Sequence, residues 1–253
     1  MNKFDIRIIF LFFFTLDVLS ENIGQPGELF PIKVNKGIFT SSNGLIKIDN
    51  SYYKLVPLSF SKQGQYVMFE DTKIFIQNKD FGESRITITN NALVNLSDED
   101  KDRTIRESKI INKALQTYSK KMKPTFSFIS PVDGIISSRY GKKRFINNSP
   151  RSPHLALDIA APEGTKVLSP EDGKVILIGN FFYSGNYLII DHGQGLLSSY
   201  SHLSSISVSE DDILKQGQEI GKVGSTGRVT GPHLHWTVYY LSLIHISEPT
   251  RLG

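Results

Sequence analysis

The stretch GPHLHWTVYY (residues 231–240) decides the fold. After its proline it is rich in aromatic and β-branched residues, which is typical of a strand. Side chains alternate between the two faces of a strand, so we expect His233 and His235 to point to the same side. One imidazole can then bind a metal ion while the other reaches a water molecule or a substrate beside it.

Two earlier motifs supply further groups for a metal site. In PHLALDIAAP (residues 153–162), His154 and Asp158 lie four residues apart, and the flanking prolines argue against a helix of the HExxH type. An extended segment that enters a strand at Leu157 can turn both side chains toward one metal ion. His202 lies in a separate motif, YSHL. Catalytic zinc usually takes three nitrogen or oxygen ligands and leaves a fourth position for water, so these groups suffice for a hydrolytic site.

Together the motifs resemble the M23 (lysostaphin/LytM-like) peptidoglycan metallopeptidases over roughly residues 126–240. Three separated motifs occur in the family's order, which makes the resemblance specific. It implies a mainly β protein with an antiparallel-sheet peptidase domain. The other stretches that carry the resemblance are SSRYG (137–141), GNY (185–187), DHG (191–193) and GSTG (224–227).

The resemblance also implies a Zn²⁺ cofactor and a role for each site residue. Zinc would be bound by His154, Asp158 and His235. His202 and His233 would orient or deprotonate the attacking water and stabilise the oxyanion.

Four other residues of this region are expected to lie outside the site. DHGQG (191–195) reads as a hairpin turn, so His192 is expected to be a surface or hydrogen-bonded core residue. Asn186 and Arg139 match family positions, and we expect them to shape the groove or the fold. Ala156 stands where family members often carry glycine, and its methyl group matters only if φ there is positive or the backbone is crowded.

Residues 1–20 are expected to be a signal peptide. The apolar run at residues 8–14 has the length of a signal-peptide core and is short for a bilayer span. Cleavage is expected after Ser20. An uncleaved anchor is the alternative, because Asp5 and Asp17 make the signal imperfect. Either interpretation places the folded part in the periplasm or cell envelope.

Three further segments are expected after the signal. Residues 21–92 alternate short β-rich runs with Asn, Gly, Ser and Lys turns, which predicts a small β-sandwich domain. Residues 93–124 predict a linker helix with Ser97 as its N-cap, ending before Pro124. The peptidase domain follows at residues 125–240.

Residues 241–253 resemble the translation of a sequencing-library adapter, and we expect them to be foreign to the natural protein. A natural carboxyl-terminal strand is the alternative, because residues 241–246 are rich in β-formers. On the first interpretation the peptidase domain is truncated at its carboxyl end, and His245 is not a metal ligand.

The sequence thus predicts a zinc-dependent endopeptidase that hydrolyses peptide cross-links of peptidoglycan through a metal-activated water. The alternative is a non-catalytic cell-wall-binding or amidase-activating LytM-like protein, but relatives of that kind typically lack one or more metal ligands. The chain has no cysteine, so zinc must rest on histidine and carboxylate. The net charge of +4 modestly favours an anionic wall polymer, and no nucleic-acid motif is present. An envelope regulator is a further partner to consider.

Overall fold

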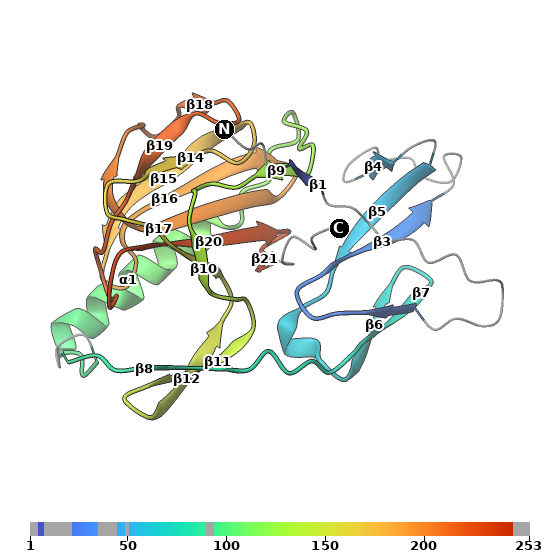
Figure 1. Cartoon of the computed structure of the whole chain (residues 1–253). Helices are drawn as coiled ribbons and strands as arrows, with labels where there is room; N and C mark the ends of the chain where they lie inside the picture. The colour runs from blue at the N-terminus through green and yellow to red at the C-terminus, as the bar shows by residue number, and fades with distance from the viewer. Residues whose placement is uncertain (1–4, 8–21, 35–44, 49–50, 90–93, 245–253) are drawn as a thin grey trace.

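The computed structural model is mainly β, as predicted, and it describes residues 5–7, 22–34, 45–48, 51–89 and 94–244 (Figure 1). The expected signal peptide lies outside the described residues, except for β1 (Asp5–Arg7), which pairs antiparallel with β9 (Ser127–Ile129). His245 and the rest of the tail after it also lie outside them. Within the described ranges, no helix has both the length and the apolar character that a membrane span requires.

Two three-stranded sheets form the amino-terminal part of the described chain. Their facing side chains make one small core, in which Val56, Leu58, Ile74 and Ile76 are buried. This packing is that of the predicted small β-sandwich. A 3₁₀ turn, η1 (Phe60–Lys62), links the sheets, whose strand orders are β2 (Asn22–Gly24), β7 (Thr72–Ile76), β6 (Gln65–Phe69) and β3 (Leu29–Val34), β5 (Ser51–Pro57), β4 (Leu45–Ile48).

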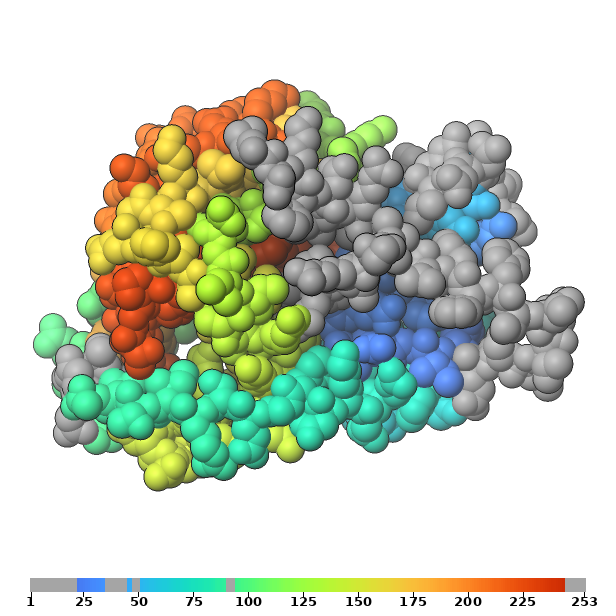
Figure 2. All heavy atoms as spheres, viewed as in Figure 1, coloured from blue at the N-terminus to red at the C-terminus, as the bar shows by residue number. Residues whose placement is uncertain are grey.

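The next strand, β8 (Glu83–Ile86), was expected in the same sandwich, and that expectation is wrong. It pairs in parallel with β11 (Lys142–Ile146), which in turn forms a hairpin with β12 (Ser149–His154). The Asn147 side chain explains the pairing, because it accepts a hydrogen bond from Ile88 N at 2.9 Å and donates to Ile88 O at 3.1 Å. We call residues 82–88 the strap. Figure 2 shows it in teal along the lower edge of the molecule.

Helix α1 (Asp98–Ala114) begins where predicted but ends earlier than Pro124. Ser97 is its N-cap, and the Ser97 Oγ accepts a hydrogen bond from Asp100 N at 3.1 Å. Three acidic residues in the first turn complement the helix dipole. Leu115 is the C-cap, so Tyr118 and Met122, which fall within the predicted range of 93–124, lie beyond the helix.

Tertiary hydrogen bonds account for this early end. Gln194 N donates to Ser119 O at 3.0 Å, and the Ser119 hydroxyl donates to the Asp191 carboxylate. These bonds tie the segment after α1 to the turn between two strands of the large sheet, where a continued helix would leave the donors and acceptors unmatched.

A ten-stranded antiparallel sheet dominates the rest of the molecule. One of its faces packs on a core that includes Leu234, Trp236 and Tyr240, while Tyr239 and Leu197 on the other face pack beneath α1 residues Ile111 and Ala114. Its main strand order is β10 (Ile135–Ser138), β13 (Leu157–Ala160), β20 (His233–Tyr240), β17 (Leu196–Ile206), β16 (Gly185–Gly193), β15 (Gly173–Phe181), β18 (Ile213–Leu214), with β14 (Lys166–Leu168), β19 (Glu219–Val223) and β21 (Leu243–Ile244) attached.

The predicted strand at residues 233–240 is thus β20, near the centre of this sheet. Beyond it, Leu241 and Ser242 both have positive φ and turn the chain back, so that β21 pairs with Tyr239 and Tyr240. The described part of the tail continues the sheet by this short hairpin.

Candidate metal centre

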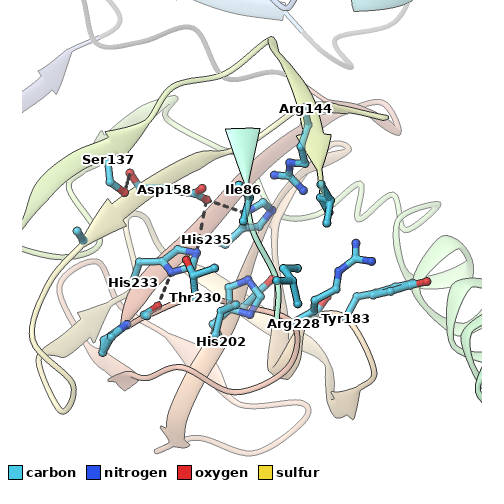
Figure 3. A pocket seen from close by; sticks show the side chains of 18 residues that line it. Ile86, Ser137, Arg144, Asp158, Tyr183, His202, Arg228, Thr230, His233 and His235 are labelled. Atoms are coloured by element: carbon cyan, nitrogen blue, oxygen red, sulfur yellow. Dashed lines mark hydrogen bonds and ion pairs between the residues drawn. The ribbon is translucent and has the colours of Figure 1, made fainter. Parts of the chain in front are cut away.

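Three strands bring the predicted ligands together, and Figure 3 shows two of these ligands, Asp158 and His235. In the register of β13 and β20, Asp158 lies opposite His235, and His235 in turn lies opposite Ser201 of β17. His154 comes from the end of β12 and is 1% exposed. One ligand atom from each of His154, Asp158 and His235 lies within 4.8 Å of the other two.

The orientation of His154 is set by the backbone. Its Nδ1 lies 3.2 Å from Arg139 O and 3.3 Å from the Ser138 hydroxyl. The carbonyl can only accept, so Nδ1 donates to it and Nε2 is the nitrogen that faces the cluster. This Nε2 lies 3.0 Å from Asp158 Oδ1 and 3.4 Å from His235 Nδ1. Arg139, which we expected to shape the site, does so through its carbonyl group.

Asp158 lies at the centre of the cluster. Its Oδ1 is 2.7 Å from His235 Nδ1 and 3.9 Å from His233 Nε2. Burial alone would raise the pKa of the carboxyl group. The hydrogen bonds from His154 and His235, with the charges of both rings, outweigh burial and hold the pKa well below its usual range. The carboxyl group is therefore ionised at neutral pH.

His202 and His233 form the adjacent wall of the site, with ring centroids 4.9 Å apart. The Nδ1 of His202 donates to Thr226 O, and the Nδ1 of His233 donates to Gly231 O, both at 2.9 Å. Each ring thus directs its Nε2 into the site. Burial, followed by the charges of His235 and His233, lowers the pKa of His202 to about 3, so this ring is neutral at physiological pH.

His202 has a φ of +65°, a backbone conformation that is rare for a residue with a side chain. Its N–H donates to Ser184 O at 2.8 Å, which holds the residue in this conformation. Asn186 supports the same region, because its amide donates to Leu203 O at 2.9 Å and its backbone N–H donates to the Thr226 hydroxyl at 2.9 Å. Asn186 therefore helps to hold His202 and Thr226 in place, which agrees with the expectation that it shapes the groove or the fold.

The two remaining expectations about this region are confirmed. His192 is 2% exposed, and it is hydrogen-bonded to Asp172 O at 2.8 Å and to the Ser198 hydroxyl at 2.7 Å, away from the cluster. Ala156 is buried, and its φ is not positive. The methyl group in place of the family's glycine is thus accommodated.

A groove of about 360 Å³ opens onto the cluster. Its lining includes Asp158 and three of the histidines, but not α1. Sequence motifs did not predict the other residues that line the groove, because these residues come from separate segments. They are Ile86 and Ile88 of the strap, Arg144 of β11, and Tyr183, Arg228 and Thr230 of two loops.

The spacing of the three donor atoms fits a zinc ion. Tetrahedral zinc with bonds of about 2.0–2.1 Å places neighbouring ligand atoms about 3.4 Å apart. The separations here are 3.0 Å, 2.7 Å and 3.4 Å, and the two shorter ones are hydrogen bonds to Asp158 that a metal ion would replace. Two imidazoles and a carboxylate are also a donor set that zinc prefers.

Comparison with known proteins identifies the same segment. The sequence profile of peptidase family M23 matches residues 152–245. The chain is 44% identical over 109 residues to peptidoglycan DD-endopeptidase ShyA of Vibrio cholerae, covering 42% of this chain and 25% of that protein. It is 39% identical over 114 residues to cell division protein DipM of Caulobacter vibrioides, covering 45% of this chain and 18% of that protein. The chain thus spans a quarter or less of the length of these two curated relatives.

One solved structure is similar over nearly the whole chain. It is a crystal structure from Pseudomonas aeruginosa assigned to the M23 peptidases, with a TM-score of 0.67 and 28% sequence identity. The match covers 90% of this chain and 93% of that one. The similarity therefore includes the strands that precede the metal cluster.

Proposed function

Because this chain belongs to peptidase family M23, we propose that it is a zinc-dependent endopeptidase that hydrolyses peptide cross-links of peptidoglycan. One observation carries the proposal: three convergent donors adjoin two oriented imidazoles in a groove. The name of the Vibrio cholerae relative, a peptidoglycan DD-endopeptidase, supports the substrate class.

In this proposal His154, Asp158 and His235 hold the metal, through Nε2, a carboxylate oxygen and Nδ1 respectively. These are the atoms that face one another in the cluster. When bound, zinc lowers the pKa of a water molecule and polarises the amide carbonyl of the substrate.

His202 and His233 handle protons. The backbone carbonyls of Thr226 and Gly231 fix their tautomers, so each presents an Nε2 lone pair. A neutral imidazole next to the metal can accept a proton from the attacking water and return it to the leaving amine. Residues 125–240 are proposed as the catalytic unit.

The proposed place of action is the periplasm or cell envelope, where peptidoglycan lies. The signal peptide expected at residues 1–20 supports export. Which amide is cut, a D,D cross-link or an interpeptide bridge, depends on how the groove binds the peptide.

A non-catalytic wall-binding protein is the second candidate. One relative that shares the segment is named as a cell division protein, a name that does not describe an enzyme. A complete donor set favours the enzyme, because a protein that only binds the wall has no use for two oriented imidazoles beside a metal site.

Zinc analysis combined with muropeptide profiling tests the proposal. The purified chain should bind one zinc ion and convert cross-linked muropeptides to monomers, and chelation should stop the reaction. His235→Ala is the control, since it removes a proposed ligand. Bound zinc without loss of cross-links would contradict the enzyme and favour the binding protein.

A further inference from the structure

Two arginines that no motif predicted line the same groove as the metal cluster. Arg144 projects from β11, and Arg228 projects from the loop between β19 and β20. Figure 3 shows both guanidinium groups directed into one part of the groove, beside His202 and Asp158. Two cations in a substrate groove are suited to binding an anionic group.

Arg144 has a hydrogen-bond donor that the described residues leave unused. Its Nε is buried and has no hydrogen-bond partner among them. A buried donor without an acceptor is unfavourable, and more so when it is charged, so an unused guanidinium N–H at a groove is evidence for an external acceptor. Burial lowers the pKa of this guanidinium group, and the Asp158 charge opposes that shift. Arginine nevertheless stays charged in proteins.

Arg228 adds a second cation and is held in place by Tyr183. Its guanidinium carbon lies 4.1 Å from the centroid of the Tyr183 ring, and the backbone N–H of Arg228 donates to Tyr183 O at 3.0 Å. Burial lowers its pKa, and Arg144 and Arg151 are close enough to lower it further. This part of the groove is therefore strongly positive.

Among its described residues, the lining of the groove carries more positive than negative side chains. Asp158 is the sole acidic residue in its described lining, and that carboxylate already meets His154 and His235. A bound metal ion would add further positive charge. Planar guanidinium groups match carboxylates best, through paired N–H···O bonds.

We propose that Arg144 and Arg228 bind a free carboxylate of the substrate peptide next to the scissile amide. They thereby make the enzyme selective for acidic cross-links over amidated ones. This inference rests on the proposed function, since it names the feature of a peptide substrate that the groove recognises. The arginines are specificity residues, and the metal cluster remains responsible for the chemistry.

Two versions of one cross-linked muropeptide dimer provide the test. In one, the carboxylates flanking the cross-link are free, and in the other they are converted to primary amides. The full chain with bound zinc should cleave the free acid with a kcat/KM about 10- to 100-fold higher, as expected when charge-assisted hydrogen bonds to one carboxylate are lost.

Matched variants separate this effect from a general loss of charge. Arg144→Gln and Arg228→Gln should each reduce the preference for the free acid, mainly by raising KM, and together they should bring it close to one. Arg106→Gln, on the exposed face of α1, removes the same charge and should keep the wild-type preference. Zinc content and melting temperature are measured for each variant, so that a folding defect in one arginine variant leaves the other to decide.

Each outcome has a distinct meaning. Equal cleavage of both dimers by the wild type, or an unchanged preference in both arginine variants, overturns the inference while the proposed function stands. If the wild type binds zinc but cleaves neither dimer, the proposed function fails, and calorimetric binding of the two dimers decides the inference. Tighter binding of the free acid, lost in the arginine variants, would then support it, and equal binding would overturn it.

Discussion

The pH dependence of stability should depend strongly on His192, which lies away from the metal cluster. Burial lowers the pKa of this histidine from 6.5 to about 4. Its Nδ1 donates to Asp172 O, and its Nε2 accepts from the Ser198 hydroxyl, which in turn lies 2.7 Å from the Tyr200 hydroxyl. A second proton on the ring would have to reverse this chain of hydrogen bonds inside the core.

The sign and the magnitude follow from these two pKa values. Between pH 6.5 and pH 4 the unfolded chain binds the proton and the folded chain does not. Stability from the neutral ring is therefore fully present above pH 6.5 and is lost as the pH falls toward 4. The loss amounts to about 2 kcal/mol between pH 7 and pH 5, and to about 3 kcal/mol in full.

Urea unfolding of the metal-free chain at pH 7 and pH 5 measures this loss, with His192→Gln as the partner variant. Glutamine keeps a donor and an acceptor but does not titrate, and all other titrating groups are common to both proteins. The free energy of unfolding of the wild type should fall by about 2 kcal/mol more than that of the variant. Parallel decreases, within about 0.5 kcal/mol, would refute the argument that burial keeps this ring neutral.

Three further predictions concern the groove and its surroundings. His233→Ala should slow turnover roughly 10²- to 10⁴-fold and leave zinc content unchanged; a fast variant with bound zinc would contradict the proton-handling role. Ala156→Gly should leave activity and zinc binding intact. It should lower the free energy of unfolding by about 1–2 kcal/mol, because a buried methyl group is lost and the unfolded backbone gains freedom. Urea unfolding measures this difference, and equal stability of the two proteins would contradict the prediction. The double change of Ile86→Ser and Ile88→Ser should raise the cleavage rate by up to about 30-fold, because the half-buried strap residues line the groove and must yield to a substrate. Ile110→Ser, on the exposed helix surface, is the matched control for that assay, and an unchanged rate in the double variant would show that the strap does not obstruct the groove.

The strand period was sufficient to predict part of the site. It placed His233 and His235 on one side of β20, and the structure has both beside Asp158. The hairpin at His192 followed from turn chemistry in the same way. These predictions succeeded because they depend on contacts within one or two strands, which the local sequence specifies.

Features that depend on distant pairing were beyond such reasoning. The strap pairs with β11 because the Asn147 side chain bonds to the backbone of Ile88, 59 residues away. Nothing in the local sequence of either segment predicts this pairing. Helix α1 ends early because Ser119 bonds to Asp191, while its own spacing would have allowed it to continue. The positive φ of His202 is likewise held from outside its own stretch, because its N–H donates to the carbonyl of Ser184.

The orientation of the histidines in the cluster likewise depends on segments outside their own motifs. His154, His202 and His233 each have Nδ1 within hydrogen-bonding distance of a carbonyl supplied by a loop or by the end of a strand. A carbonyl cannot donate, so the tautomer is settled before any metal or substrate arrives, and no energy is needed to reorient the ring later. Motif spacing therefore identifies which residues meet, but the irregular segments around them determine which nitrogen each one presents. Substitutions that disturb those segments, such as one at Asn186 of β16, should thus impair the site without removing any group that touches the substrate.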